Sequence, residues 1–206
     1  MFNYLHKIIL FFICVTLVSK SYSDSYHFLI GRGLSVARIQ TNTYFGYNIY
    51  AKSLIKLTEN LSFGTGLRYE ELYSGQNTTL YNNNKYTFSS LQAGGDFAYS
   101  LNFEQIKIFI NPFLYYALRD NWQRNTVNSQ GTTTSQNPQT QNHYAFGTNF
   151  DLLFILNNFF YFGAGAGYSL STIKYNNYYD NNNNYYSGSS GFFHTVTMNY
   201  IIGLYL

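Results

Sequence analysis

Several charged residues stand in long stretches where apolar and polar residues alternate, always among the small or polar positions. In a β-strand, residues two apart share a face, so these charges would share one face while apolar side chains take the other. An unpaired charge on an enclosed face is costly. We therefore predict a structural network of ion pairs, with Lys56 on the same face. Its members are Lys52, Arg68, Glu70, Asp96, Lys107, Arg119 and Asp151.

The two aspartates of this set have candidate partners on neighbouring stretches. Because opposite charges on adjacent strands attract most where water is scarce, we predict that Asp96 pairs with Arg68 or Lys107. By the same argument, Asp151 pairs with Lys107 or Arg119. If the enclosed space were wet instead, the same charges would line a narrow conducting pathway.

Other combinations of reactive residues give no catalytic or metal site. His27, His143 and His194 are scattered, and none has a second His or a Cys at ligand spacing. Glu70 and Glu71 would point to opposite faces of a strand, so they cannot act as an acid/base pair. A nucleophile, base and orienting group on one surface is also missing. We predict that the chain is not an enzyme and needs no cofactor.

The stretch Tyr144–Ser171 shows most clearly which elements would position these charges. Two runs of period two flank Asn157-Asn158, which is typical of a tight hairpin. Each arm has roughly 13 residues, against the usual 5 or 6 of a soluble strand. Gly163–Gly167 is not a dinucleotide fingerprint, because more strand and no helix follows it.

The same alternation predicts eight strands. Their connections alternate between three short turns and four longer loops, an asymmetry typical of bacterial outer-membrane barrels. The fold class predicted is all-β, an eight-stranded antiparallel up-and-down transmembrane β-barrel. The strands are predicted at about 26–36, 44–57, 61–73, 86–101, 106–118, 144–156, 159–171 and 192–206, and the longer loops at about 37–43, 74–85, 119–142 and 175–191.

Three segments depart from the simple pattern. In the first strand, Arg32 lies on the face opposite Gly31 and Gly33. Because we expect Arg32 to avoid the lipid-facing side, either the glycine face looks outward or a bulge switches the register. Pro112 removes one ladder hydrogen bond, which predicts a bulge or a locally open pairing. The segment 120–142 has no apolar periodicity, and we assign it no regular structure.

Residues 1–23 have the features of a secretory signal: Lys7, an apolar run too short to span a bilayer, and small residues two apart at 21 and 23. The barrel domain would then be 24–206. Without Lys7 and Lys20, ten basic and nine acidic residues remain, a net charge of +1 that predicts no nucleic-acid partner. Cys14 falls in the signal, so the exported chain would have no disulfide.

The chain resembles the small eight-stranded outer-membrane β-barrels of the OmpA, OmpX and OmpW type. The residues that carry the resemblance are Gly64–Tyr69, Gly163–Tyr168 and Tyr200–Leu206. The resemblance implies a multi-pass protein of the bacterial outer membrane and a last strand that the insertion machinery reads. In the family that strand ends in an aromatic residue, whereas here it ends in Leu206. The insertion signal implied is Tyr200, Ile202, Leu204 and Leu206.

Three functions fit these features. The first is a structural or surface-interaction role, adhesin-like, in which the long loops contact a host or surface ligand. The second is a small channel for ions or apolar solutes. The third is a secreted, soluble, lipocalin-like binding barrel, which would have to turn its apolar face inward.

Overall fold

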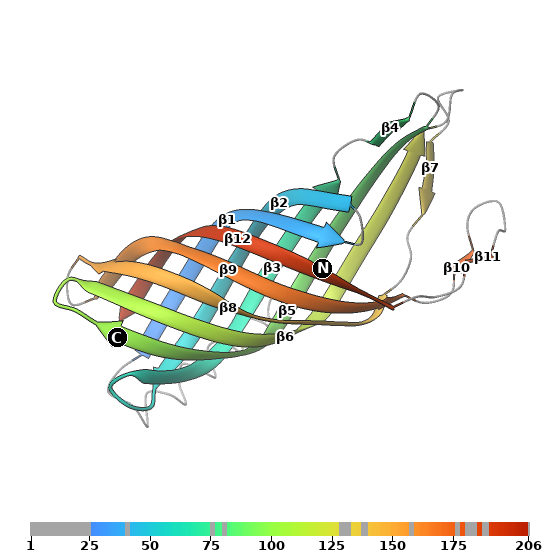
Figure 1. The fold of residues 1–206 in the computed structure, drawn as a ribbon. Coiled ribbons are helices and arrows are strands. Elements are labelled where there is room, and N and C mark those ends of the chain that lie inside the picture. The colour runs from blue at the N-terminus through green and yellow to red at the C-terminus, as the bar shows by residue number, and fades with distance from the viewer. Residues whose placement is uncertain are drawn as a thin grey trace, which may run out of the picture.

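The structure is a computed structural model in which eight long strands close into an antiparallel barrel (Figure 1). Around the barrel the order is β1-β2-β3-β5-β6-β8-β9-β12, and β12 pairs with β1 to close it. The described residues are 26–39, 42–74, 77–79, 82–127, 133–136, 140–156, 159–175, 178–179, 185–186 and 190–205. The predicted fold class is confirmed. The predicted signal, Leu206 and the Asn157-Asn158 turn lie outside the described residues.

The barrel strands are β1 (Tyr26–Ile39), β2 (Asn42–Lys56), β3 (Leu61–Ser74), β5 (Asn82–Asn102), β6 (Ile106–Val127), β8 (Thr140–Ile155), β9 (Phe160–Tyr175) and β12 (Ser190–Tyr205). Four short strands accompany them: β4 (Asn77–Thr79), β7 (Thr133–Gln136), β10 (Tyr178–Tyr179) and β11 (Tyr185–Tyr186). Within the described residues, no helix is long and apolar enough to cross a membrane.

The outer face of the barrel is apolar. On each barrel strand the alternation turns large hydrophobic side chains outward, where many keep 40% or more of their surface exposed. The pattern is clearest on β12, where exposed and buried residues alternate almost without exception. Outward-facing examples are Leu34, Ile49, Phe63, Phe97, Leu114, Phe150, Phe162 and Met198.

The interior is filled by two apolar clusters with polar side chains between them. One cluster lies toward the short turns and consists of Leu29, Tyr50, Leu54, Ala98, Phe109, Leu153, Tyr161 and Ile201. The other lies toward the opposite end and consists of Ala37, Tyr44, Leu72, Phe88, Ile173 and Phe193. Eight strands enclose a space just wide enough for side chains to fill.

Glycines make room for the polar interior. A Cβ on Gly66 would lie 2.2 Å from Tyr115 Oη and 2.6 Å from Asp96 Oδ2. A Cβ on Gly165 would lie 2.4 Å from Asp151 Oδ1. The glycines on the inward face of the strands therefore leave the space that large inward side chains of other strands occupy.

The first strand differs from the prediction. Both registers of β1, with β2 and with β12, run without a shift, so no bulge is present. Leu29, Gly31 and Ser35 face inward, and Arg32 faces outward between Ile30 and Leu34. The prediction that Arg32 would avoid the outer face was wrong. The inward side chain of Tyr50 occupies the space beside Gly31, which fixes the orientation of β1.

Strand β6 contains both irregularities of the barrel wall. Its pairing with β5 is interrupted between the pairs Asp96–Phe113 and Tyr99–Ile110, around Pro112, and no register shift follows. The locally open pairing predicted at Pro112 is confirmed. Farther along, the register shifts by one residue, so that Leu118 is an extra residue on β6. This bulge exchanges the inward and outward faces of the strand beyond it.

The longer connections contain more strand than predicted. β5 begins at residue 82 and β6 continues to residue 127. The start of β5 and the end of β6 form two arms that pair with each other past the end of the barrel. β4 pairs with the extended part of β5, and β7 with that of β6. We call β4, β7 and the extended arms of β5 and β6 the sheet extension (Figure 1). Assigning no structure to 120–142 was wrong for these strands, because backbone pairing needs no apolar periodicity.

Candidate functional site

The polar interior holds an ion pair at its centre. Lys52 Nζ on β2 lies 2.7 Å from Asp151 Oδ2 on β8, and both side chains are about 1% exposed or less. The Asn111 amide on β6 donates to the same carboxylate oxygen over 2.8 Å. The pairing of Asp151 with Lys107 or Arg119 was wrong. Lys52 reaches it across the interior, and strand-neighbour arguments do not consider such contacts.

Asp96 also has another partner than the one predicted. Its Oδ2 accepts a hydrogen bond of 2.7 Å from the Tyr115 hydroxyl, which comes from β6. The pairing with Arg68 or Lys107 was therefore wrong. Arg68 Nη2 instead lies 2.8 Å from Glu70 Oε1 two residues along β3, and its guanidinium lies 5.9 Å from the Phe113 ring centroid. The tyrosine was missed because the sequence reading sought only charged partners.

Lys107 lies among rings near the short turns. Its Nζ is 3.3 Å from His27 Nε2 and 5.1 Å from the Phe109 ring centroid. Two tyrosine rings, of Tyr161 and Tyr205, lie within about 6 Å of the same ammonium. Lys107 was expected to face inward, and it is buried. Among the described contacts its partners are aromatic rings and a histidine, and no carboxylate is paired with it.

Arg119 is exposed on the outer face, so its predicted place in the interior was wrong. The bulge at Leu118 causes this, because it reverses the faces of β6. Asp120 turns inward instead, and its Oδ2 lies 3.0 Å from His143 Nδ1. The alternation of apolar and polar residues in the sequence does not show where a one-residue bulge lies, so the bulge could not be predicted from it.

Ser90, His143 and Asp120 resemble a hydrolase triad in composition but not in geometry. Ser90 Oγ and Asp120 both approach the same ring nitrogen of His143, Nδ1, at 3.4 Å and 3.0 Å. A relay requires the base to contact the nucleophile and the orienting acid through different nitrogens. Nε2 is buried against apolar rings such as Phe88 and Phe193. The cluster is therefore a packing element beneath the end of the barrel.

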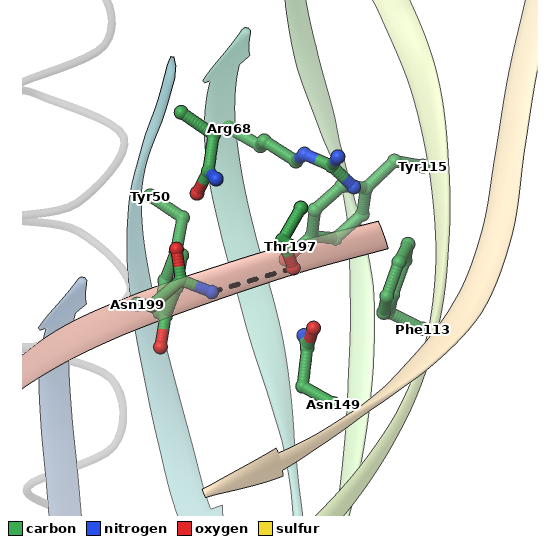
Figure 2. A pocket seen from close by; sticks show the side chains of 8 residues that line it. Tyr50, Arg68, Phe113, Tyr115, Asn149, Thr197 and Asn199 are labelled. Atoms are coloured by element: carbon green, nitrogen blue, oxygen red, sulfur yellow. Dashed lines mark hydrogen bonds between the residues drawn. The ribbon is translucent and has the colours of Figure 1, made fainter. Parts of the chain in front are cut away.

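A small cavity lies within the polar part of the interior, lined by side chains from several strands (Figure 2). Its volume is about 10 Å³, which holds about one water molecule. The amide of Asn199 on β12 donates to the Thr197 hydroxyl over 3.4 Å at its wall (Figure 2). The other lining residues are Asn48, Tyr50, Arg68, Phe113, Tyr115 and Asn149.

Three residues of the insertion signal, Tyr200, Ile202 and Leu204, lie on the outer face of β12, and Leu206 is outside the described residues. Tyr200 is 82% exposed and Ile202 is 66% exposed, while Leu204 is half-buried. Their role in insertion stays a prediction. In the described part of the chain, no group of three or more His, Cys, Asp or Glu side chains could hold a metal ion.

No protein-family model and no curated protein matches this chain. Among solved structures it is similar to Neisserial surface protein A, NspA, at 10% identity and a TM-score of 0.52, over 88% of this chain and 99% of that one. It is also similar to the attachment invasion locus protein Ail of Yersinia pestis, at 12% identity and a TM-score of 0.45, over 89% of this chain and 99% of Ail.

The fold is that of the small eight-stranded outer-membrane barrels. At 10% identity, the likeness to NspA shows the shared fold and no shared activity. A further similar structure is the outer membrane protease OmpT from Escherichia coli, at 7% identity and a TM-score of 0.47, over 89% of this chain and 97% of OmpT. The absence of enzymatic activity in this chain stays a prediction.

Proposed function

We propose that this protein is an integral β-barrel of the bacterial outer membrane with a plugged interior, whose role is to present the sheet extension for contact with a partner at the cell surface. The observation that carries the proposal is the filled interior. Two apolar clusters and a layer of paired polar groups occupy it, and the cavity between them holds about one water molecule. Such an interior favours a scaffold over a channel.

The outer face supports a membrane location. Exposed aliphatic and phenyl side chains surround the barrel, and tyrosines such as Tyr116, Tyr144 and Tyr168 gather toward the end that bears the extension. Phe103 and Phe159 are exposed at the short turns. An apolar band between aromatic girdles is typical of outer-membrane barrels. The exposed rings also favour this location over the soluble lipocalin-like alternative, in which apolar side chains would line the interior.

The orientation follows from the connections. Outer-membrane barrels have short periplasmic turns and long external loops. The turns at 57–60 and 103–105 are short, and we infer from them that the sheet extension lies outside the cell. Among the described strands, β4 and β7 each pair with a single neighbour, so the other backbone edge of each faces no described strand. An unpaired edge can receive a strand from another protein, which suits the extension to a surface-contact role.

Two measurements test the proposal. In planar bilayers containing the refolded chain, we expect a closed trace with no steps of conductance. Steady ion conductance would favour the channel and contradict the plugged scaffold. Recovery of the chain from cells in a detergent-free soluble fraction would contradict the membrane location itself.

The surface role needs its own assay. Bacteria that display the full chain are compared with bacteria that display a variant in which 133–136 is replaced by Gly and Ser, for attachment to a panel of immobilised matrix proteins and glycans. We expect attachment to at least one of these, and its loss in the variant. If neither strain attaches to any, the contact role is wrong.

A further inference from the structure

The outer face of β3 carries a carboxylate that three tyrosines surround. Glu71 points outward, while the neighbouring Glu70 is buried on the inward face. The hydroxyls of Tyr47 on β2 and Tyr69 on β3 donate to Glu71 Oε2 over 2.5 Å and 2.9 Å, and the Tyr73 hydroxyl donates to Oε1. We call Glu71 and these three tyrosines the Glu71 cluster. All four side chains are half-buried, so the cluster can be reached from outside the barrel.

The cluster keeps a full negative charge. Hydrogen bonds from neutral phenols spread the charge of a carboxylate but do not cancel it. Among the described residues, no lysine, arginine or histidine forms an ion pair with Glu71. Glu71 is also the one carboxylate on the outer face of the described barrel strands. Its charge is therefore not part of the ion pairs that hold the interior together.

The remaining hydrogen-bonding positions of the cluster are acceptors. Each phenol gives its hydrogen to Glu71, so its oxygen has only lone pairs left. An ionised carboxylate has about four acceptor positions, and the phenols do not use all of them. The rings of Tyr47 and Tyr69 stand side by side, with centroids 6.2 Å apart and planes tilted by 48°. A positively charged hydrogen-bond donor therefore complements the cluster.

The chemistry of the cluster favours an organic ammonium over a metal ion. Calcium takes about six to eight oxygen ligands, several of them usually from carboxylates, and this cluster has a single carboxylate. A primary ammonium presents several N–H donors in a compact group, which suit the carboxylate and the phenol oxygens together. Aromatic rings attract a cation that lies near their faces. A quaternary ammonium has no N–H to donate, so the primary form is the better match.

The cluster lies at the level of lipid headgroups. Leu61, the first residue of β3, is ten residues from Glu71, which is roughly 33 Å along a strand. At the usual tilt of about 40°, this length spans roughly 25 Å across the membrane, the height of the apolar band. The outward side chains of β3 between these residues begin with Phe63 and include Leu67 before the tyrosines are reached. Glu71 therefore lies at the edge of the band.

We propose that the Glu71 cluster binds the primary ammonium group of a lipid headgroup. This inference rests on the membrane location proposed above and is independent of the surface-contact role. The carboxylate supplies the counter-charge, and the phenol oxygens accept further N–H bonds. Because Tyr47 comes from β2 and the other members from β3, a lipid bound here lies against the wall where these two strands pair.

Binding of phosphatidylethanolamine to the full chain, refolded in dodecylmaltoside micelles, tests this inference. Native mass spectrometry follows the bound lipid over a titration. Phosphatidylcholine, whose nitrogen carries no hydrogen, is the matched lipid. We expect the parent to bind phosphatidylethanolamine roughly tenfold more tightly than phosphatidylcholine, the usual effect of a hydrogen bond to a charged group. Equal binding of the two lipids by the parent would overturn the proposal, whatever the variants do.

Two variants assign the preference to the carboxylate. Glu71→Gln removes the charge and keeps the size of the side chain, and we expect it to bind both lipids equally weakly. Glu104→Gln, in an exposed short turn, is the matched control and should keep the preference of the parent. An unchanged preference for phosphatidylethanolamine in the Glu71→Gln variant would overturn the proposal.

A further arm identifies the source of the ammonium. Free ethanolamine at the same concentration should not displace the lipid, and if it does, the cluster is a free-amine site and the lipid proposal fails. Heat-modifiable migration of each variant shows whether the barrel has folded. Membrane fractionation of the parent separates a failure of this proposal from a failure of the membrane location on which it rests.

Discussion

At the scale of single residues, the Lys52–Asp151 pair should matter most to stability, because neither side chain meets bulk water. The change Asp151→Asn keeps the shape of the side chain but leaves the Lys52 ammonium without its counter-charge. We expect a loss of about 3 kcal/mol in the free energy of unfolding, which is the usual effect of breaking a buried ion pair. Urea unfolding of the refolded barrel in micelles measures it.

Two further variants make this test specific. Replacing both partners, Lys52→Met with Asp151→Leu, should recover much of the loss, since no charge is then left buried. Glu59→Gln, in an exposed turn, is the control and should leave stability unchanged. If Asp151→Asn is as stable as the parent, the interior is wet and the channel alternative gains support.

Arg32 gives a prediction of opposite sign. It faces outward on β1, midway between Phe28 and Val36 and thus near the middle of the apolar band. A cation at the midplane on the lipid side of a barrel costs about 2–4 kcal/mol. Arg32→Leu should therefore raise the free energy of unfolding from lipid vesicles by about 2 kcal/mol. A decrease would mean that this guanidinium has a stabilising partner in the membrane.

At the scale of elements, the bulge of β6 decides which residues face the interior. Deleting Leu118 would leave a regular ladder in which Ala117 still pairs with Gln92 and Arg119 with Leu91, so Arg119 stays outward and Asp120 inward. The contact between Asp120 and His143 would be kept. We expect a barrel that inserts and unfolds at the same urea concentration as the parent, and a lower concentration would show that the bulge itself stabilises the wall. Substituting Leu118 by Ala, which keeps the bulge, is the control.

The last strand is the second element with a testable orientation. Leu204→Asp places a charge on the outer face of β12 close to the short turns, where its cost is at the low end of the range for barrels. We expect impaired assembly, seen as loss of heat-modifiable migration, with Leu206→Phe assembling as well as the parent or better. Normal migration of the Asp variant would contradict a role for Leu204 in insertion.

At the scale of the whole molecule, barrel and sheet extension should be separable. The barrel closes through pairs that lie below the extension, such as Tyr116–Tyr144 between β6 and β8. Removing 123–139 and joining the ends with a short Gly-Ser turn should leave the barrel folded in micelles, because closure entropy depends only slowly on loop length. A chain that no longer folds would show that the extension is part of the core.

The positions of most strands, the faces of most of them and the charged interior could be predicted from the residues alone. These features follow from the local alternation of apolar and polar residues. When only one side of the barrel wall is apolar, a strand with one apolar face can point that face in only one direction. Lys52, Arg68, Glu70, Asp96, Lys107 and Asp151 were predicted to face inward, and all six are buried.

Which polar groups contact one another inside the barrel could not be predicted without the folded structure. Lys52 reaches Asp151 across the interior, because barrel curvature points side chains at partners that flat strand pairing does not bring together. Tyr115 binds Asp96 from the neighbouring strand β6, a contact that a search among charged residues alone does not find. The bulge at Leu118 moved Arg119 outward, and a single extra residue in a ladder has no local signature. Polar segments beyond the barrel, such as β4 and β7, likewise form strands. Their backbone hydrogen bonds depend on a neighbouring strand and not on apolar periodicity.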